Sequence, residues 1–225
     1  MDNDFLEDFA QMALDLHGEE SVHETVDRVL QYALKAVHCG YAGVVFVHNG
    51  QRIETAAATD SLVADLEAIQ VECGEGPDID VLADRYSVIV GDTRTETRWP
   101  RWAHAVSQAG IRSLLSVRMY TSSSTVGTLN LYDEQPNRFD VADQEVAHVL
   151  ARHAAVALAS AREEEHLWQA IDSRKRIGQA QGILMERYNI DEERAFAVLM
   201  RYSQSRNMKL RAVAEKLVST RDLPH

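Results

Sequence analysis

The sequence predicts an α+β protein: one mostly antiparallel sheet with helices on its faces, then a long connecting helix and a three-helix bundle. Two observations carry this prediction. Between residues 21 and 160, segments with a helical period alternate with strand-like runs, and two pairs of those runs are joined by short polar turns. Beyond residue 160, the apolar residues recur only at helical spacing.

The first elements are a helix and a hairpin. Residues 21–38 are predicted to be helical because apolar residues such as Val22 and Val26 recur every three to four positions. The run "YAGVVFVHNGQRIETAAAT" predicts a β-hairpin around Asn49-Gly50, since both turn residues tolerate a positive φ. "SLVADLEAIQ" predicts a short helix, and "VECGEGPDIDVLADR" predicts a glycine- and proline-punctuated loop that leads into another.

The remaining strands and their helices follow in the same way. "YSVIVGD" predicts a strand and "RWPRWAHAVSQAG" a helix closed by Gly110. "IRSLLSVRMYT" and "VGTLNLYDE" are predicted to be antiparallel neighbours joined by the polar turn 122–124. Asp140 is a good N-cap for the helix that begins after it. About 140 residues suffice for one hydrophobic core.

The helix that begins after Asp140 has no evident stop. No proline occurs up to Tyr188, and the only glycines are Gly178 and Gly182. A helix of roughly 45 residues is too long for one small domain to cover. We therefore expect a homodimer that pairs through the connecting helix, residues 161–172; two helices with a break near Glu164 are the alternative.

Composition narrows the class of protein. The 225 residues carry a net charge of −12, with 45% hydrophobic and 26% charged residues, as in ordinary globular proteins. No apolar run reaches the roughly 18 residues of a membrane span, and "MDNDFLEDFAQ" lacks the pattern of a signal peptide. We expect a cytoplasmic protein with no membrane partner.

Catalytic and metal-binding signals are weak. Cys39 and Cys73 form no C-x-x-C motif, so a disulfide framework or cysteine zinc site is not expected, and both thiols are expected to be inert. The nine histidines show no H-E-x-x-H spacing. The sequence predicts no metal, no cofactor and no enzymatic activity; haem ligation by a single histidine such as His104 stays open.

Charge divides the chain into unequal parts. Residues 166–225 have a balance of +4, whereas residues 1–165 have a balance of −16. This asymmetry indicates two units, of which the smaller has a polyanionic partner. The predicted boundaries are an N-terminal segment 1–20, a sensor domain 21–160, the connecting helix 161–172 and a C-terminal domain 173–225.

A basic surface is predicted in the C-terminal domain. Asp191 caps its second helix, "SRNM" is a connector, and a third helix follows. From 194 to 214 the chain carries five basic residues and no acid: Arg194, Arg201, Arg206, Lys209 and Arg211. This favours a phosphate-binding face over an ordinary solvated one. Ser203, Gln204 and Asn207 could supply hydrogen bonds to base edges.

Gln181 and Gly182, in the first helix of the C-terminal domain, each have two interpretations. Helical spacing places Gln181 in the middle of the face formed by Ile177, Ala180 and Leu184, with Gly182 at its margin. A glycine inside a helix costs about 0.5–1 kcal/mol relative to alanine, so it needs a reason. Either helices approach closely at Gly182 while Gln181 bonds in the core, or the pair clears a shelf for another chain or a nucleic acid.

The C-terminal residues resemble a known family. "SRKRIGQAQGILMERYNIDEERAFAVLMRYSQSRNMKLRAVAEKL" is similar to the ANTAR domain, the three-helix RNA-binding module of bacterial transcription antiterminators. The match covers nearly all of 173–218, although the family often has lysine where this chain has Gln181. "GEGPDID", "TRTETRWPRWAHAVSQAGIRSLLSVRM" and "VGTLNLYDEQPNRFD" resemble the GAF domain that precedes ANTAR in a group of actinobacterial regulators. Those relatives often have cysteine in place of Asp78.

The resemblance implies a function and a set of site residues. Two ANTAR units in a dimer bind RNA that carries two small stem-loops with six-base loops, and this blocks a terminator or frees a ribosome-binding site. Single-stranded loop bases suit such side-chain recognition. The expected RNA-binding residues are Arg174, Gln181, Gly182, Arg201, Ser203, Arg206, Asn207, Lys209 and Arg211.

The GAF-like half has an unknown ligand. Members of that family bind small molecules, chromophores or haem, or only dimerise. Asp78, Trp99 and Trp102 are the candidate ligand-binding residues, and core packing is the other interpretation of the tryptophan pair. The prediction is therefore a ligand- or signal-responsive antitermination regulator. One alternative is a sensor whose C-terminal bundle only dimerises. Another is a DNA-binding helix-turn-helix protein, but this sequence lacks the glycine-centred tight turn of that motif.

Overall fold

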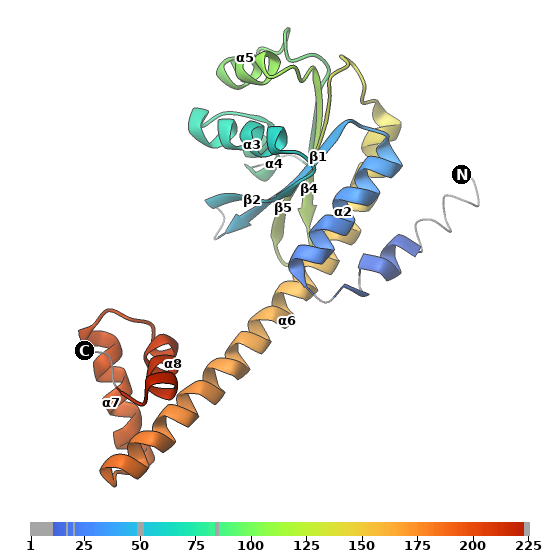
Figure 1. Ribbon diagram of the computed structural model, residues 1–225. Coiled ribbons are helices and arrows are strands. Elements are labelled where there is room, and N and C mark those ends of the chain that lie inside the picture. The colour runs from blue at the N-terminus through green and yellow to red at the C-terminus, as the bar shows by residue number, and fades with distance from the viewer. Residues whose placement is uncertain (1–10, 17, 20, 49–51, 84–85, 223–225) are drawn as a thin grey trace. The chain divides into compact units, whose positions relative to one another are not determined.

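A computed structural model describes residues 11–16, 18–19, 21–48, 52–83 and 86–222. The chain divides into two compact units, residues 1–162 and residues 163–225, and each is described by itself. The model confirms the predicted α+β class, with its sheet, flanking helices, long helix and C-terminal bundle (Figure 1).

The first unit is built on a five-stranded antiparallel sheet with the order β2-β1-β5-β4-β3. Its strands are β1 (Tyr41–His48), β2 (Arg52–Ala58), β3 (Ser87–Val90), β4 (Ser113–Tyr120) and β5 (Thr125–Asp133). Both predicted hairpins, β1–β2 and β4–β5, are confirmed. The predicted turn residues Asn49 and Gly50 lie outside the described residues.

One face of the sheet packs on α2 (Val22–Val37) and on the first part of α6 (Val141–Tyr188). The core on this side is apolar; Leu129 and Leu131 of β5 lie in it together with Leu150 of α6. α2 begins where predicted because the Ser21 hydroxyl accepts the Glu24 N–H at 3.2 Å and caps the helix.

The other face is covered by α3 (Ser61–Cys73), α4 (Pro77–Ala83) and α5 (Pro100–Gln108). α3 runs further than the sequence predicted, through residues 71–73, and Gly74 ends it in the left-handed conformation at φ 66°. Gly110, with φ 92°, follows α5 as expected. This face holds the second core of the unit and also the polar groups described below.

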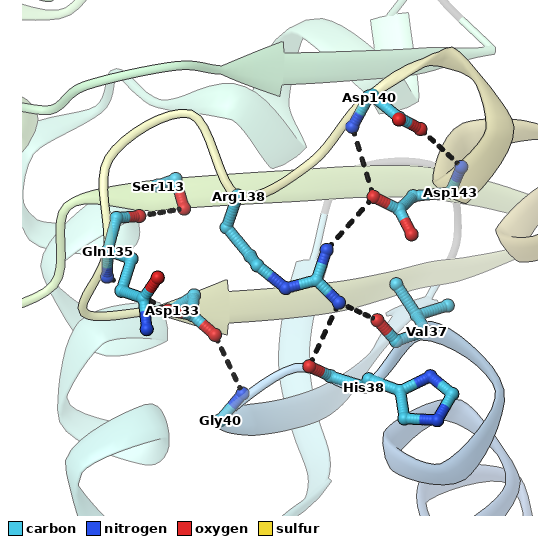
Figure 2. Close-up of polar contacts among 9 residues, drawn as sticks. All are labelled: Val37, His38, Gly40, Ser113, Asp133, Gln135, Arg138, Asp140 and Asp143. Carbon is cyan, nitrogen blue, oxygen red and sulfur yellow. Dashed lines mark hydrogen bonds and ion pairs between the residues drawn. The ribbon is translucent and has the colours of Figure 1, made fainter.

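Arg138 ties the end of α2 to the start of α6 (Figure 2). Its guanidinium donates to the C-terminal carbonyls of α2 at Val37 and His38, and to the Asp143 carboxylate at 3.1 Å. Asp140 caps α6, as predicted: its carboxylate accepts the Asp143 N–H at 2.9 Å, while Asp143 accepts the Asp140 N–H at 3.1 Å.

α6 is one helix of 48 residues, without the break near Glu164 that the alternative interpretation required. In the second unit its C-terminal part packs with α7 (Glu192–Ser205) and α8 (Leu210–Thr220). The predicted cap of α7 is confirmed, since Asp191 accepts the Arg194 N–H at 2.8 Å. The core of this bundle consists of Ala180, Leu184, Ala195, Leu199, Val213, Ala214 and Leu217.

Candidate functional site

The C-terminal unit presents exposed basic side chains around the connector between α7 and α8. Arg201 lies near the end of α7, Arg206 is its C-cap, and Lys209 is the N-cap of α8. All three are exposed, and no ion pair neutralises any of them within the part of the chain that the structure describes. The connector therefore carries uncompensated positive charge available to an anionic partner.

Arg211 differs from the other basic residues of the segment. Its Nη2 donates to Asp172 on α6 at 2.9 Å, and its Nε donates to Glu215 one turn further along α8 at 2.8 Å. The hydrogen bond to Glu215 raises the pKa of the guanidinium, and the negative charges of Glu215 and Asp172 add to this. The charge of Arg211 is balanced within the bundle, so this predicted RNA-binding residue also joins α8 to α6.

Two predicted base-reading residues shape the connector itself. The Ser203 hydroxyl donates to the Met208 carbonyl at 2.6 Å, which commits its proton and leaves the oxygen able only to accept. Asn207 adopts a left-handed conformation at φ 50°, which asparagine tolerates better than most residues. Its backbone N–H bonds the Gln204 carbonyl, and its side chain is exposed.

On α6 the structure separates the two interpretations of Gly182. A Cβ atom added to Gly182 would meet no described atom within 4 Å, and the same holds for Gly178 one turn earlier. Close helix approach therefore does not explain either glycine. Gln181 is half-buried and donates to the Glu192 carbonyl at 3.3 Å, so it links α6 to the start of α7. Arg174 is exposed on the same helix.

A separate polar cluster is buried in the first unit, on the α3–α5 side of the sheet. Asp78 of α4, 2% exposed, is its centre. Its carboxylate accepts from Gln70 at 2.9 Å, Ser116 at 2.8 Å and Asn130 at 2.8 Å, while its own N–H bonds the Gln70 side chain. Burial raises the pKa of Asp78, and these hydrogen bonds act in the opposite direction.

Glu67 of α3 is the second carboxyl in this cluster and is 3% exposed. Burial, and then the negative charge of Asp78, raise the pKa of Glu67 to about 8. Its Oε1 lies 3.5 Å from Asn130 Nδ2. Its Oε2 is buried and has no hydrogen-bond partner among the described residues, and the same is true of Asn130 Oδ1 and the Tyr132 hydroxyl.

A hollow of about 330 Å³ between α3 and β2 reaches this cluster. It is lined by Ile53, Thr55, Glu67, Ala68, Val71 and Glu72. The described residues of its wall are three apolar side chains, two carboxyls and Thr55, and none of them is basic. Such a wall is unfavourable to an anion.

Trp99 and Trp102 lie in the core and not over this hollow. They are 4% and 0% exposed and meet edge to face, with ring centroids 5.7 Å apart. Their surroundings are the apolar residues of the second core, which agrees with the packing interpretation. Of the three residues singled out for a ligand, the structure therefore brings only Asp78 into the polar cluster.

Sequence reasoning missed Glu67, Gln70 and Asn130. One signal was present: Thr128, Asn130 and Tyr132 alternate with Leu129 and Leu131 along β5. Such alternation is usually read as a solvated face opposite a buried one. Here both faces are covered, so the polar side chains are buried.

The Ser87–His148 pair and the Cys39 thiol are the two other groups of the first unit to consider for reactivity. Ser87 Oγ lies 2.9 Å from His148 Nε2 and accepts from Gln144 at 2.7 Å, which ties β3 to α6. No carboxylate orients His148 among the described residues, so the pair is not a catalytic triad. Burial raises the pKa of the Cys39 thiol to about 12, which keeps it protonated.

Comparison with known families now identifies the two units. The GAF domain model matches residues 19–159, and the ANTAR domain model matches residues 165–218. The chain belongs to the GAF domain family and has the GAF–ANTAR architecture. ANTAR is an RNA-binding antitermination domain, so this is the architecture of a sensor–regulator with an RNA partner.

Solved structures agree on the fold. The GAF domain of an Acinetobacter phosphoenolpyruvate-protein phosphotransferase is 16% identical, with a TM-score of 0.56 over 74% of this chain and 99% of that one. Free methionine-R-sulfoxide reductase from Neisseria meningitidis is 16% identical, with a TM-score of 0.54 over 69% and 89%. At this identity the likeness concerns the fold alone. No curated protein matches the chain.

Among the described residues, every helix is too short or too polar to span a lipid bilayer. The same residues contain no group of three or more His, Cys, Asp or Glu residues placed to hold a metal ion.

Proposed function

We propose that the protein is a transcription antitermination regulator whose ANTAR domain binds tandem hexaloop stem-loops in mRNA leaders, and whose GAF domain responds to a small-molecule signal. The observation that carries the proposal is the exposed basic connector of the ANTAR domain, where Arg201, Arg206 and Lys209 have no described acidic partner. The protein acts by binding, not by catalysis, and is cytoplasmic.

The charge distribution supports an RNA partner for this face. Phosphate contacts from Arg206 and Lys209 would supply salt-dependent affinity, and the start of α8 adds backbone N–H groups that attract anions. The Asn207 side chain is exposed, and we assign to it the reading of a splayed loop base. The rest of the chain, with its charge balance of −16, repels RNA, so binding is confined to the C-terminal domain.

Recognition of two stem-loops needs two ANTAR domains, which a homodimer provides. Exposed apolar residues on α6 support pairing through this helix: Leu167 is 61% exposed, Trp168 62% and Ile171 47%. Large exposed apolar side chains on one stretch of helix are typical of a surface that another chain covers. A second copy of the same helix is the partner we propose.

The test is anisotropy binding of the full-length protein to an RNA with two hexaloop hairpins. Controls are a single hairpin, the same RNA with altered loops, and duplex DNA of equal charge, each at two salt concentrations. The proposal predicts tight binding that needs both hairpins and one protein dimer per RNA. Equal binding to duplex DNA would contradict it, as would a monomer in sedimentation at the binding concentration.

The second candidate is a sensor whose C-terminal bundle only dimerises. It would follow if no RNA bound under any condition. Because an inhibited resting state would also fail to bind, residues 163–225 are assayed alone, since this unit has its own core. RNA binding by that fragment would favour antitermination, and its absence would favour the dimerisation module.

A further inference from the structure

The GAF domain buries four side-chain polar atoms that have no hydrogen-bond partner among the described residues, one of which is Trp102 Nε1 in the second apolar core. Glu67 Oε2, Asn130 Oδ1 and the Tyr132 hydroxyl are all buried without a described hydrogen-bond partner. Leaving such an atom unpaired costs about 1–3 kcal/mol, so native proteins rarely do so without a reason. Burial raises the pKa of Tyr132, and the negative charges of Glu67 and Asp78 add to this.

The chemistry of these atoms indicates what would satisfy them. Asn130 Oδ1 is an acceptor, Glu67 Oε2 is an acceptor once the carboxyl is ionised, and the Tyr132 hydroxyl can accept as well as donate. Asn130 Nδ2 is already committed to Asp78, which fixes the orientation of the amide. A ligand for this place therefore brings N–H donors. Asp78 cannot be that partner, since its own oxygens are already saturated by Gln70, Ser116 and Asn130.

The hollow between α3 and β2 gives the ligand a path and a shape. Glu67 lies at its wall, and Ile53, Ala68 and Val71 add apolar surface, with Glu72 as a second carboxyl. A volume of about 330 Å³ lies at the lower end of the range for small-molecule sites. A bare metal ion fits poorly, because hard cations take six or more oxygen ligands, and the described residues offer no such cluster.

We propose that this hollow binds a small organic cation, an ammonium or amidinium with a short apolar part, through the carboxyl of Glu67. The proposal rests on the sensor role proposed above and names the chemical class of its signal. An N–H donor of the cation satisfies the unpaired Glu67 Oε2 on the wall of the hollow, and the apolar part packs on Ile53 and Val71. The two carboxyls of the described wall disfavour phosphate-bearing and carboxylate ligands.

Binding should release a proton. Burial and the negative charge of Asp78 on α4 disfavour the ionised form of Glu67, whereas hydrogen bonding from Thr55 and Asn130 favours it. Glu72 of α3 lies on the wall of the same hollow, and the charge of Glu67 acts in turn on Tyr132 of β5. With a pKa of about 8, Glu67 is about nine-tenths protonated at pH 7. A cation pairs with the ionised form, so its affinity should rise as the pH is raised from 6 to 8, a range in which both test amines described below stay protonated.

The experiment is calorimetric titration of the full-length protein with n-butylamine and benzylamine. Their isosteric alcohols and carboxylates keep the shape and change the charge, and calcium chloride tests for a metal site. We expect binding of the amines only, with proton release that shows as a dependence of the heat on the buffer. Equal binding of the alcohols, or no amine binding up to about 10 mM, would overturn the proposal.

Two variants complete the test. Glu67→Gln should weaken amine binding about tenfold or more and abolish proton release, whereas Glu145→Gln, the same change on an exposed position of α6, should leave both unchanged. Circular dichroism verifies that each variant is folded. If Glu67→Gln does not fold, Glu67→Asp replaces it in the test. Unchanged affinity in both Glu67 variants would refute the assignment. RNA binding is measured on the same samples, so failure of the antitermination proposal is seen separately.

Discussion

The Glu67 carboxyl lies directly against Gly43: a Cβ atom at position 43 would come within 2.2 Å of Glu67 Oε1 and 2.8 Å of a Val63 methyl group. Gly43 is paired with Asn130 across β1 and β5, so its bare backbone forms the floor beneath the polar cluster. The glycine is needed for space, since a side chain here would occupy the place of the carboxyl.

Gly43→Ala is therefore expected to displace Glu67 and Val63 without preventing folding. Overpacking of this kind costs about 1–3 kcal/mol of unfolding free energy, which urea denaturation measures. Amine binding should be lost together with the position of the carboxyl. Gly40→Ala is the matched control in the same segment, because the nearest atom to its added Cβ is at 3.6 Å, an ordinary contact. Wild-type stability of the Gly43→Ala variant would show that the space between Gly43 and Glu67 can hold a methyl group.

Glu67 also predicts a pH dependence of stability. Its pKa is raised from an ordinary 4.5 to about 8, so the native state keeps a proton that the unfolded chain has lost. The free energy of unfolding should therefore fall as the pH rises from about 4.5 to about 8, and then level off. Glu67→Gln removes this contribution. The urea midpoint of the Glu67→Gln variant, measured relative to that of the wild type, should therefore increase as the pH rises through this range.

The comparison with Glu145→Gln isolates the buried group. Residue 145 is exposed, so its substitution should give a constant difference from the wild type across the same pH range. If the curve for Glu67→Gln ran parallel to that of the wild type, the proton would not be held on Glu67.

The basic residues of the ANTAR domain should differ in their salt dependence. Arg206→Ala and Lys209→Ala each remove an unpaired charge, so each should reduce the slope of log K against log salt by about 0.7–0.9, with the dimer intact. Arg211→Ala should reduce it less, because Arg211 is already paired with Asp172 and Glu215. Filter binding from low to high salt measures all three slopes. Equal slopes for Arg211→Ala and Lys209→Ala would mean that RNA displaces the ion pairs.

Local patterns predicted the fold well because each element carries its own signal. The helical spacing of apolar residues predicted the helices, and the strand-like runs predicted the strands. The capping residues Asp140 and Asp191 predicted where two of the helices begin. The end of α3 was placed too early, because "VECGEG" contains glycines that the helix reaches only at Gly74. The family resemblance likewise rested on consecutive residues, which sequence displays directly.

The candidate sites were harder to predict because they depend on contacts between distant residues. Arg211 meets Asp172, 39 positions away, and nothing near either residue indicates the pair. Asn130 looked solvent-facing because alternation reveals two faces of a strand but not which helices cover them. For Gly182 the sequence suggested close packing of two helices. The structure excludes this explanation, because the space around the glycine is open.

That open space makes Gly182→Ala the most discriminating substitution in the ANTAR domain. Alanine at this exposed helical position should stabilise α6 by about 0.5–1 kcal/mol, because nothing opposes its Cβ. If RNA lies against the glycine, as the resemblance to the ANTAR domain implies, the same change should weaken RNA binding several-fold. Thermal denaturation and anisotropy on one sample measure both effects. Gly178→Ala brings the same helical gain one turn earlier; equal loss of RNA affinity in the two variants would assign the effect to a stiffer helix and remove Gly182 from the interface.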